Sequence, residues 1–407
     1  MNPEASIGPR KFWRLIIIAF LLITGVGVGL RIYPSAGFTR VGYDESLYRR
    51  YVDDLSTHGL TSYPDFAEYY VERQQQLPGA ILPPTRFLYI YSAYVWRSAT
   101  GEDSLTSLHH TSCLFSILLL IASMGFAWRL GGVGMALGVG ALMACAPTQI
   151  HMGQHALIDG FFAFWATLTV WFFWESLRSP GMLRWAAAYA LAFALMVMTK
   201  ENAAFAALGI LALLSANHWL KFGKVTPSLL LLTIAGPLLG FVLLVALCGG
   251  LGTFIRTYQL LTAKASILPY AIATGDGPWY RYLVDLLLVS PLVFLLAWGW
   301  LFRVTRDRTP ECYLLVFIAA TYLAMCNVKY GMNLRYTNMW DMPLRYLALG
   351  CVVDLARTLP IYRLTAIVAA VAALCAFDLR QYYIFFVQGS LYELVTSGLL
   401  HALKILK

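Results

Sequence analysis

Charged residues are scarce in this chain, and the few that it has are scattered. Of its 407 residues, 13% are charged and 59% are hydrophobic, and the mean hydropathy is +0.65. Soluble domains carry about one charged residue in four, so water is not the main solvent of this chain. The formal net charge of +9 comes from dispersed Lys and Arg, which argues against a nucleic-acid-binding protein.

Clear metal-ligand and disulfide patterns are also missing. The cysteines all fall in apolar runs, so we interpret them as small residues that face lipid or the core: Cys113, Cys145, Cys248, Cys312, Cys326, Cys351 and Cys375. His151 and His155 are spaced like a metal pair, but no clear third ligand stands nearby. The sequence therefore supports no cofactor, and a bound divalent metal stays an open alternative.

Two further patterns are absent, and long apolar runs take their place. There is no sustained alternation of period two, as a β-barrel requires, and no internal repeat of the kind common in transporters. Runs of about 20 apolar residues recur instead, which is the length of a membrane-spanning helix. We predict an all-α integral membrane protein with about eleven transmembrane helices in one domain over 1–407, at 15–32, 109–129, 132–150, 157–176, 184–199, 202–220, 226–248, 283–302, 311–328, 342–357 and 363–378.

The tail 379–407 is amphipathic, and we expect it to lie on the outer leaflet. A twelfth span is the alternative, and no soluble domain is expected after the last span. The apolar run 184–220 is interrupted by Thr199-Lys200-Glu201-Asn202. A single helix through this point would place two charges at mid-membrane, so we predict a tight turn.

Basic residues mark the predicted inner loops. With a cytoplasmic N-terminus, every inner loop carries at least one Lys or Arg, as the positive-inside rule requires. The long segments 33–108, 249–282 and 329–341 then lie outside. Within the first of them, 44–58 and 85–99 fit helices in the membrane interface. The compact length and the absence of Asn-x-Ser/Thr sequons favour a bacterial inner membrane, with the active site on the periplasmic side.

Acidic residues occur where the chain leaves the predicted bilayer. Asp44 and Glu45 follow the first span closely, and an acid there could accept a proton from an attacking hydroxyl as a general base. Alternatively, the pair only caps an interfacial helix. Asp159 opens the fourth span and either stabilises its helix N-terminus or lines a polar site.

Basic residues stand at outward-facing helix ends that are far apart in the sequence. Lys200, Arg335 and Arg345 are such residues, and Arg86 follows the turn at Pro83-Pro84. If they converge, they would suit the developing negative charge of a phosphate or pyrophosphate leaving group. The alternative for any one of them is a side chain that reaches toward lipid headgroups.

This ordered set resembles the polytopic GT-C glycosyltransferases, in particular the branch of protein O-mannosyltransferases and the lipid A aminoarabinose transferase. Members of that branch have an Asp-Glu pair in the first outer loop, a Pro-Pro turn, an Asp that opens the fourth span, a Thr-Lys turn, and a late Arg-Tyr before a Pro. The matching positions are Asp44-Glu45, Pro83-Pro84, Asp159, Thr199-Lys200, Arg335-Tyr336 and Pro343. The family often has Lys directly before the Pro pair, where this chain has Leu82.

The resemblance implies an inverting glycosyltransferase. It would move a sugar from a polyprenyl- or dolichyl-phosphate donor to a hydroxyl of a lipid, glycan or protein acceptor on the outer side. Asp44 would be the base, and the residues expected to bind substrate are Glu45, Arg86, His155, Asp159, Lys200, Arg335, Tyr336 and Arg345. The alternatives are a transporter or flippase for lipid-linked glycans, which would favour ionisable residues deep in the helices, and a related scaffold that has lost catalysis.

Overall fold

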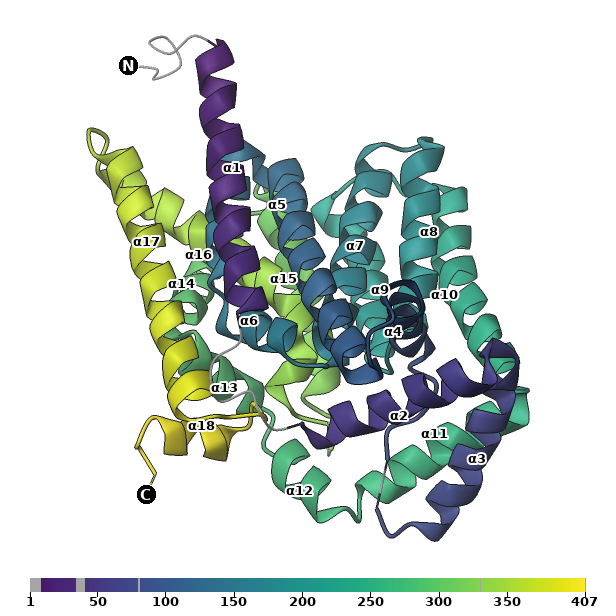
Figure 1. Cartoon of the computed structure of the whole chain (residues 1–407). Coiled ribbons are helices and arrows are strands. Elements are labelled where there is room, and N and C mark those ends of the chain that lie inside the picture. The colour runs from purple at the N-terminus through teal and green to yellow at the C-terminus, as the bar shows by residue number, and fades with distance from the viewer. Residues whose placement is uncertain (1–8, 34–40, 80, 330, 407) are drawn as a thin grey trace.

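The structure, a computed structural model, describes residues 9–33, 41–79, 81–329 and 331–406. Within these ranges the chain forms helices and turns and no strand (Figure 1), which confirms the all-α prediction. The helices are α1 (Pro9–Ile32), α2 (Tyr43–His58), η2 (Leu60–Ser62), α3 (Tyr63–Gln76), α4 (Phe87–Thr100), α5 (Ser104–Ala144), α6 (Pro147–Gln154), α7 (Ile158–Arg178), α8 (Leu183–Val197), α9 (Ala203–Leu220), α10 (Pro227–Leu247), α11 (Leu251–Ala265), α12 (Pro269–Gly275), α13 (Arg281–Val289), α14 (Pro291–Trp300), α15 (Thr309–Met325), η3 (Leu334–Trp340), α16 (Asp341–Leu355), η4 (Ala356–Thr358), α17 (Arg363–Tyr382), η5 (Tyr383–Gln388) and α18 (Thr396–Ala402).

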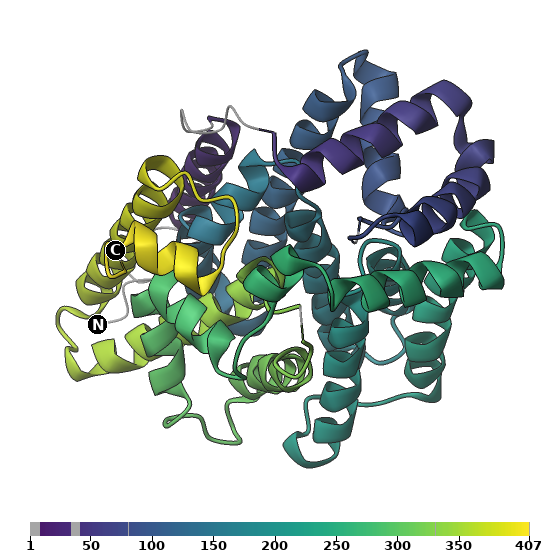
Figure 2. The ribbon, with the colours of Figure 1, turned by 90° about the horizontal axis from the view of Figure 1, so that it is seen from below.

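The long helices stand side by side as a bundle, and shorter helices cover one end of it (Figure 1). We call the covering set the loop layer; it consists of α2, α3, α11, α12 and α18. Seen from below, α11 and α12 cross the end of the bundle between α2 and α3 on one side and α18 on the other (Figure 2). Helix α1 begins at the opposite end (Figure 1). Segments predicted as separate outer loops therefore gather at one end of the molecule.

Several helices are built to cross a membrane. Five described helices are long and apolar enough on their own, namely Arg10–Ile32, Ser104–Ala144, Ala203–Leu220, Pro227–Leu247 and Arg363–Gln388. Shorter apolar helices stand beside them at Leu183–Val197, Pro291–Trp300 and Thr309–Met325. These helices support an integral membrane protein, while the number of spans stays a prediction.

Two predicted spans differ from the helices that form. Gly132 has a φ of 80° inside α5, which Gly adopts without strain. The halves of α5 lie against each other, because a Cβ on Gly140 would be 2.7 Å from Met124. The second half ends at Ala144 and α6 follows separately, so the predicted span 132–150 extends too far. The span 283–302 is split into α13 and α14, because Pro291 has no N–H with which to continue a helix.

The segments around the predicted spans are mostly as expected. The segments 44–58 and 85–99 form α2 and α4, and the turn near Lys200 separates α8 from α9. Helix α3 was not predicted. In the tail, α18 has seven residues, too few to cross a membrane, so the described part of the chain contains no twelfth span after η5.

A cluster of buried aromatic side chains holds α2 against the bundle. Tyr48 of α2 contacts Tyr89 of α4 edge to face, with ring centroids 5.1 Å apart, and Tyr89 contacts Phe161 of α7 at 5.4 Å. All three side chains are fully buried, and burying a large side chain of this kind contributes about 1.5–3 kcal/mol. The helix that carries Asp44 is therefore firmly placed relative to α7.

Candidate active site

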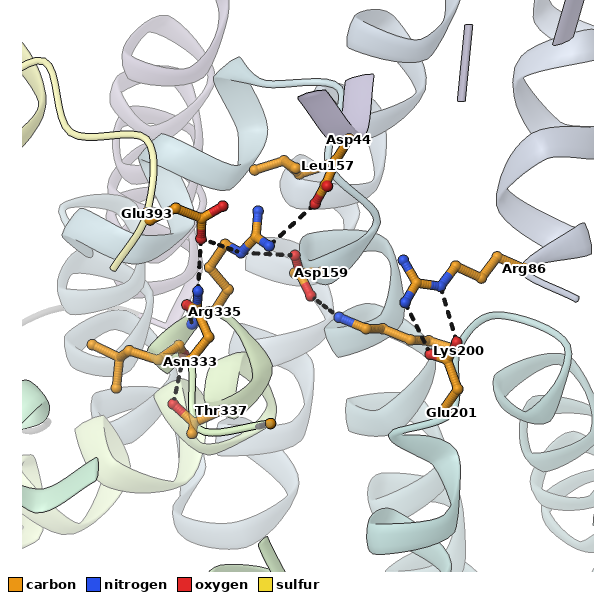
Figure 3. Close-up of polar contacts among 12 residues, drawn as sticks. Asp44, Arg86, Leu157, Asp159, Lys200, Glu201, Asn333, Arg335, Thr337 and Glu393 are labelled. Atoms are coloured by element: carbon orange, nitrogen blue, oxygen red, sulfur yellow. Dashed lines mark hydrogen bonds and ion pairs between the residues drawn. The ribbon is translucent and has the colours of Figure 1, made fainter. Parts of the chain in front are cut away.

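Asp44 lies in the first turn of α2, which begins after Gly42. The backbone N–H of Gly42 donates to Glu45 Oε2 at 2.6 Å, and this bond fixes the start of the helix. The carboxylate of Asp44 points toward Arg335, whose Nη2 lies 3.2 Å from Asp44 Oδ2 (Figure 3). The first turn of α2 thus presents one acid to a residue 291 positions later in the chain.

Glu45 turns away from Asp44 and braces α2 against the linker between α6 and α7. Its Oε1 lies 2.9 Å from His155 Nδ1 and accepts from the backbone N–H of Ala156 at 2.8 Å. Burial alone would raise the pKa of Glu45, but hydrogen bonds from His109 and His155 outweigh it and lower that pKa well below its usual range. Burial lowers the pKa of His155 despite the nearby carboxylate.

Asp159 and Lys200 form a buried ion pair. Asp159 stands in the first turn of α7, and the α8–α9 turn brings Lys200 Nζ onto its carboxylate. Lys200 also lies over the ring of Tyr336, 3.8 Å from the ring centroid, a cation–π geometry. Burial lowers the pKa of Lys200, while the charge of Asp159 acts in the opposite direction.

Arg335 is the hub of the cluster (Figure 3). It lies in η3, where the side chain of Asn333 caps the turn by accepting from the Arg335 N–H at 3.0 Å. Besides Asp44, its guanidinium contacts Glu393 at 3.3 Å and Asp159 at 3.8 Å. Burial opposes its charge, but the three carboxylates raise the pKa of Arg335 well above its usual value. Its Nη1 is buried and has no hydrogen-bond partner among the described residues.

Arg86 clamps the outer loop to the α8–α9 turn. Its Nε and Nη2 each donate to Glu201 at 3.2 Å, and its Nη1 donates to Tyr48 at 2.6 Å. The paired nitrogens make a bidentate contact, which is the geometry that favours Arg over Lys. The charge of Arg86 is therefore paired with Glu201 beside the cavity.

These side chains line one cavity of about 160 Å³. Its charged and aromatic wall consists of Asp44, Arg86, Asp159, Lys200, Arg335 and Tyr336. A larger cavity of about 480 Å³ adjoins it. Both are bounded by Tyr43, Ile81, Leu268 and Tyr270 as well as by Asp44. The structure thus joins a charged chamber to a mainly apolar one, and Asp44 borders both.

Three expected site residues do not line these cavities. Glu45 and His155 lie behind α2, in contact with each other. Arg345 is buried in α16, where it donates to Asp341 at 2.8 Å and to Asp378 at 2.9 Å. Since both ends of its guanidinium are used inside the bundle, we leave Arg345 out of the site that we propose below.

Sequence analysis missed two residues of the site, Glu393 and Tyr270. Glu393 lies between η5 and α18, where it accepts from Asn333 Nδ2 at 2.6 Å and from the hydroxyl of Tyr270. One signal was available, because Glu393 is the only acid in the tail 379–407. Tyr270 stands in a segment rich in other aromatic residues, and no pattern singles it out.

Part of this chain matches a known sequence family, and most of it matches solved structures. The sequence model of the dolichyl-phosphate-mannose-protein mannosyltransferase family matches residues 84–262. Among solved structures, ArnT from Cupriavidus metallidurans in the apo state is 14% identical with a TM-score of 0.54, over 96% of this chain and 74% of that one. A search of curated protein sequences finds no match.

An archaeal enzyme has a similar fold. The oligosaccharyltransferase of Archaeoglobus fulgidus is 14% identical with a TM-score of 0.64, over 91% of this chain. The oligosaccharyltransferase AglB from Archaeoglobus fulgidus, in complex with an inhibitory peptide and a dolichol-phosphate, has a TM-score of 0.63 at 15% identity, over 92% of this chain. This chain spans 55–56% of the archaeal chains. The family match covers part of this chain, and the likeness to these solved structures shows that the chain shares their fold.

Proposed function

We propose that the chain transfers a sugar from a polyprenyl-phosphate donor to an acceptor hydroxyl, with inversion at the anomeric carbon. The observation that carries this proposal is the meeting of Asp44, Asp159, Lys200 and Arg335, from four separate segments, at one cavity. An acid and two buried cations around a small chamber suit a reaction in which a hydroxyl loses a proton while a phosphate takes up negative charge.

The donor class is supported by relatives of the same fold. One structure of ArnT from Cupriavidus metallidurans is bound to undecaprenyl phosphate, and the AglB complex contains a dolichol-phosphate. In this chain, Lys200 and Arg335 are the cations placed to hold such a phosphate. Arg335 can bind two phosphate oxygens with its planar fork, and Lys200 can add a point charge.

Asp44 is the base in this proposal. The acceptor oxygen attacks the anomeric carbon, its proton passes to Asp44, and the bond between that carbon and the phosphate oxygen breaks. Arg335 contacts Asp44 at 3.2 Å, so the side chain that would bind the leaving phosphate would also hold the base. Asp159 then positions Lys200 through their ion pair. The loop layer would face the periplasmic side of a bacterial inner membrane, with a cytoplasmic N-terminus.

Replacement of Asp44 by Asn tests the proposal. The full chain in proteoliposomes is given a panel of undecaprenyl-phosphate sugars with a membrane extract as acceptor, and released undecaprenyl phosphate is measured. We expect release with at least one donor, and a loss of about 10²–10⁴-fold in Asp44→Asn, the usual contribution of a general base. Undecaprenyl phosphate itself should still bind to the variant.

Asp65→Asn is the matched control, because Asp65 is an exposed acid of α3 in the same layer. It should leave release unchanged. The proposal fails if no donor is consumed by the unaltered chain, or if Asp44→Asn retains most of its activity.

A further inference from the structure

Two hydrogen-bond donors and one guanidinium converge on the carboxylate of Glu393. The hydroxyl of Tyr270 donates to Oε1. Asn333 Nδ2 donates to Oε2 at 2.6 Å, and Arg335 Nε forms an ion pair with Oε2 at 3.3 Å (Figure 3). The donors come from α12 and from η3 with the residue before it, and Glu393 comes from the tail. Converging donors around a negatively charged group are the arrangement by which proteins bind an oxyanion.

Among the residues that the structure describes, the charges around Arg335 do not balance. The carboxylates of Asp44, Asp159 and Glu393 surround two cations, Arg335 and Lys200. The neighbouring pair of Arg86 with a glutamate is neutral as a unit. A donor phosphate would add negative charge to a cluster that already has one acid too many. Like charges this close repel strongly, so the entry of a phosphate favours the withdrawal of one carboxylate.

Glu393 is the acid best placed to withdraw. The side chain of Asp159 is 3% exposed and is held by Lys200, and Asp44 is fixed in the first turn of α2. Glu393 and Asp44 are similarly exposed, at 15% and 17%, and both border the larger cavity. Glu393 differs in lying on a non-helical segment, which can move more easily than the first turn of a helix. Arg335 also has a buried nitrogen, Nη1, without a hydrogen-bond partner among the described residues. The site therefore offers donors for an anion beyond those that Glu393 uses.

We propose that Tyr270, Asn333 and Arg335 form a binding site for a phosphate oxygen, and that Glu393 fills this site until the donor arrives. This inference rests on the proposed function and adds a means of regulation to it. Glu393 acts as an internal competitor: it keeps the donors in place while the site is empty, yields to the incoming phosphate, and returns when the lipid phosphate product leaves. It is a positioning residue and takes no part in bond making.

The direction of the effect of Glu393→Gln on lipid phosphate binding is the test. The substitution removes the charge but keeps the size of the side chain. We expect undecaprenyl phosphate to bind the full chain in nanodiscs about threefold to tenfold more tightly, the range for removal of one partly exposed competing charge. The KM for the donor should fall by a similar factor. The kcat should fall too, because the product is no longer displaced.

Glu68→Gln is the matched control, since Glu68 is an exposed glutamate of α3 and should leave binding unchanged. In the Glu393→Gln background, Tyr270→Phe should reverse the gain, because the phosphate would lose one donor. If Glu393→Gln does not fold, Glu393→Asp keeps the charge but shortens its reach, and a smaller gain is expected.

The outcomes separate the inference from the proposed function. If the unaltered chain binds no undecaprenyl phosphate, both are overturned. If the chain binds it but Glu393→Gln binds equally or more weakly, Glu393 only supports the structure, and this inference alone is overturned. Tighter binding with a lowered KM and kcat supports the competitor role, which a purely structural residue would not produce.

Discussion

At the scale of single residues, the site depends on side chains that share partners. Arg335 contacts three carboxylates, and Glu45 contacts the linker after α6 as well as its own helix. The sequence indicated which residue types carry charge at the outer ends of the helices. It did not indicate which of the two acids faces the cavity. Neighbouring residues of a helix point about 100° apart, so Asp44 and Glu45 face different sides, and tertiary packing decides which of them faces the cavity.

The brace made by Glu45 should be visible in the pH dependence of stability. Its folded-state pKa lies below the ordinary value of 4.5, so its contribution is complete above that value and is lost as the pH falls through the folded-state pKa. We expect Glu45→Gln to lower stability by about 2 kcal/mol at pH 7, since buried hydrogen bonds to a charged group are lost.

The measurement is the melting temperature of the purified protein at pH 5 and at lower pH. The difference between the unaltered chain and Glu45→Gln should shrink below pH 4.5. A difference that stays constant down to pH 3 would contradict the assigned direction of the shift.

At the scale of elements, the sequence predicted helices better than it predicted their ends and faces. Apolar runs locate α7 to α10 closely, because only a helix satisfies the backbone in lipid. The break at Pro291 was missed because its flanks are equally apolar. Arg345 was expected near the cavity as a helix-end residue, but it stands one turn after Asp341 and pairs with it inside the bundle. Position along a helix does not determine which neighbours its side chain meets.

The start of α2 packs against the tail with no room for a side chain at Gly42. A Cβ there would lie 2.2 Å from Tyr392. We expect Gly42→Ala to push Tyr392 and its neighbour Glu393 away from the site and to lower transfer at least about tenfold, since small misplacements of reacting groups are costly. The measurement is kcat/KM for the donor.

Gly134→Ala is the control for that substitution, because no atom lies within 4 Å of a Cβ at this position. It should leave activity unchanged. If Gly42→Ala is equally active, the contact between α2 and the tail does not position the site.

At the scale of the whole molecule, the order of motifs predicted the candidate site in part. Asp44, Asp159, Lys200 and Arg335 lie up to 291 positions apart, and their meeting was expected from a family resemblance together with the inferred topology. The contribution of the tail, where Tyr392 and Glu393 line the larger cavity, was not expected. In the sequence, Glu393 is a single acid in an amphipathic segment and cannot be distinguished from a solvated residue. Only the fold shows that it contacts Arg335.

Removal of the chain after Gln388 should therefore disable the site while the bundle persists. This deletion removes the Leu394 carbonyl, which accepts from the Leu334 N–H at 3.3 Å, and Thr396, which donates to Asp285 at 2.6 Å. We expect transfer to fall at least about 100-fold, with the helical content of the bundle retained in circular dichroism. The deletion removes both tail residues that line the larger cavity, Tyr392 and Glu393, whereas Glu393→Gln removes only one charge.

A shorter deletion of residues 404–407 serves as the control, since it leaves α18 intact. Activity close to that of the full chain is expected. If the longer deletion is also active, the tail is not part of the site.

The closing of the site by Tyr392 and Glu393 has a consequence for biosynthesis. Asp44 emerges from the ribosome well before Arg335, Tyr392 and Glu393, because it precedes them in the sequence. Under the proposed function, a partly inserted chain would have Asp44 without Arg335 and would not consume the lipid-linked donor. If the proposed function holds, transfer would begin only once translation has passed residue 393 and Glu393 has joined the site.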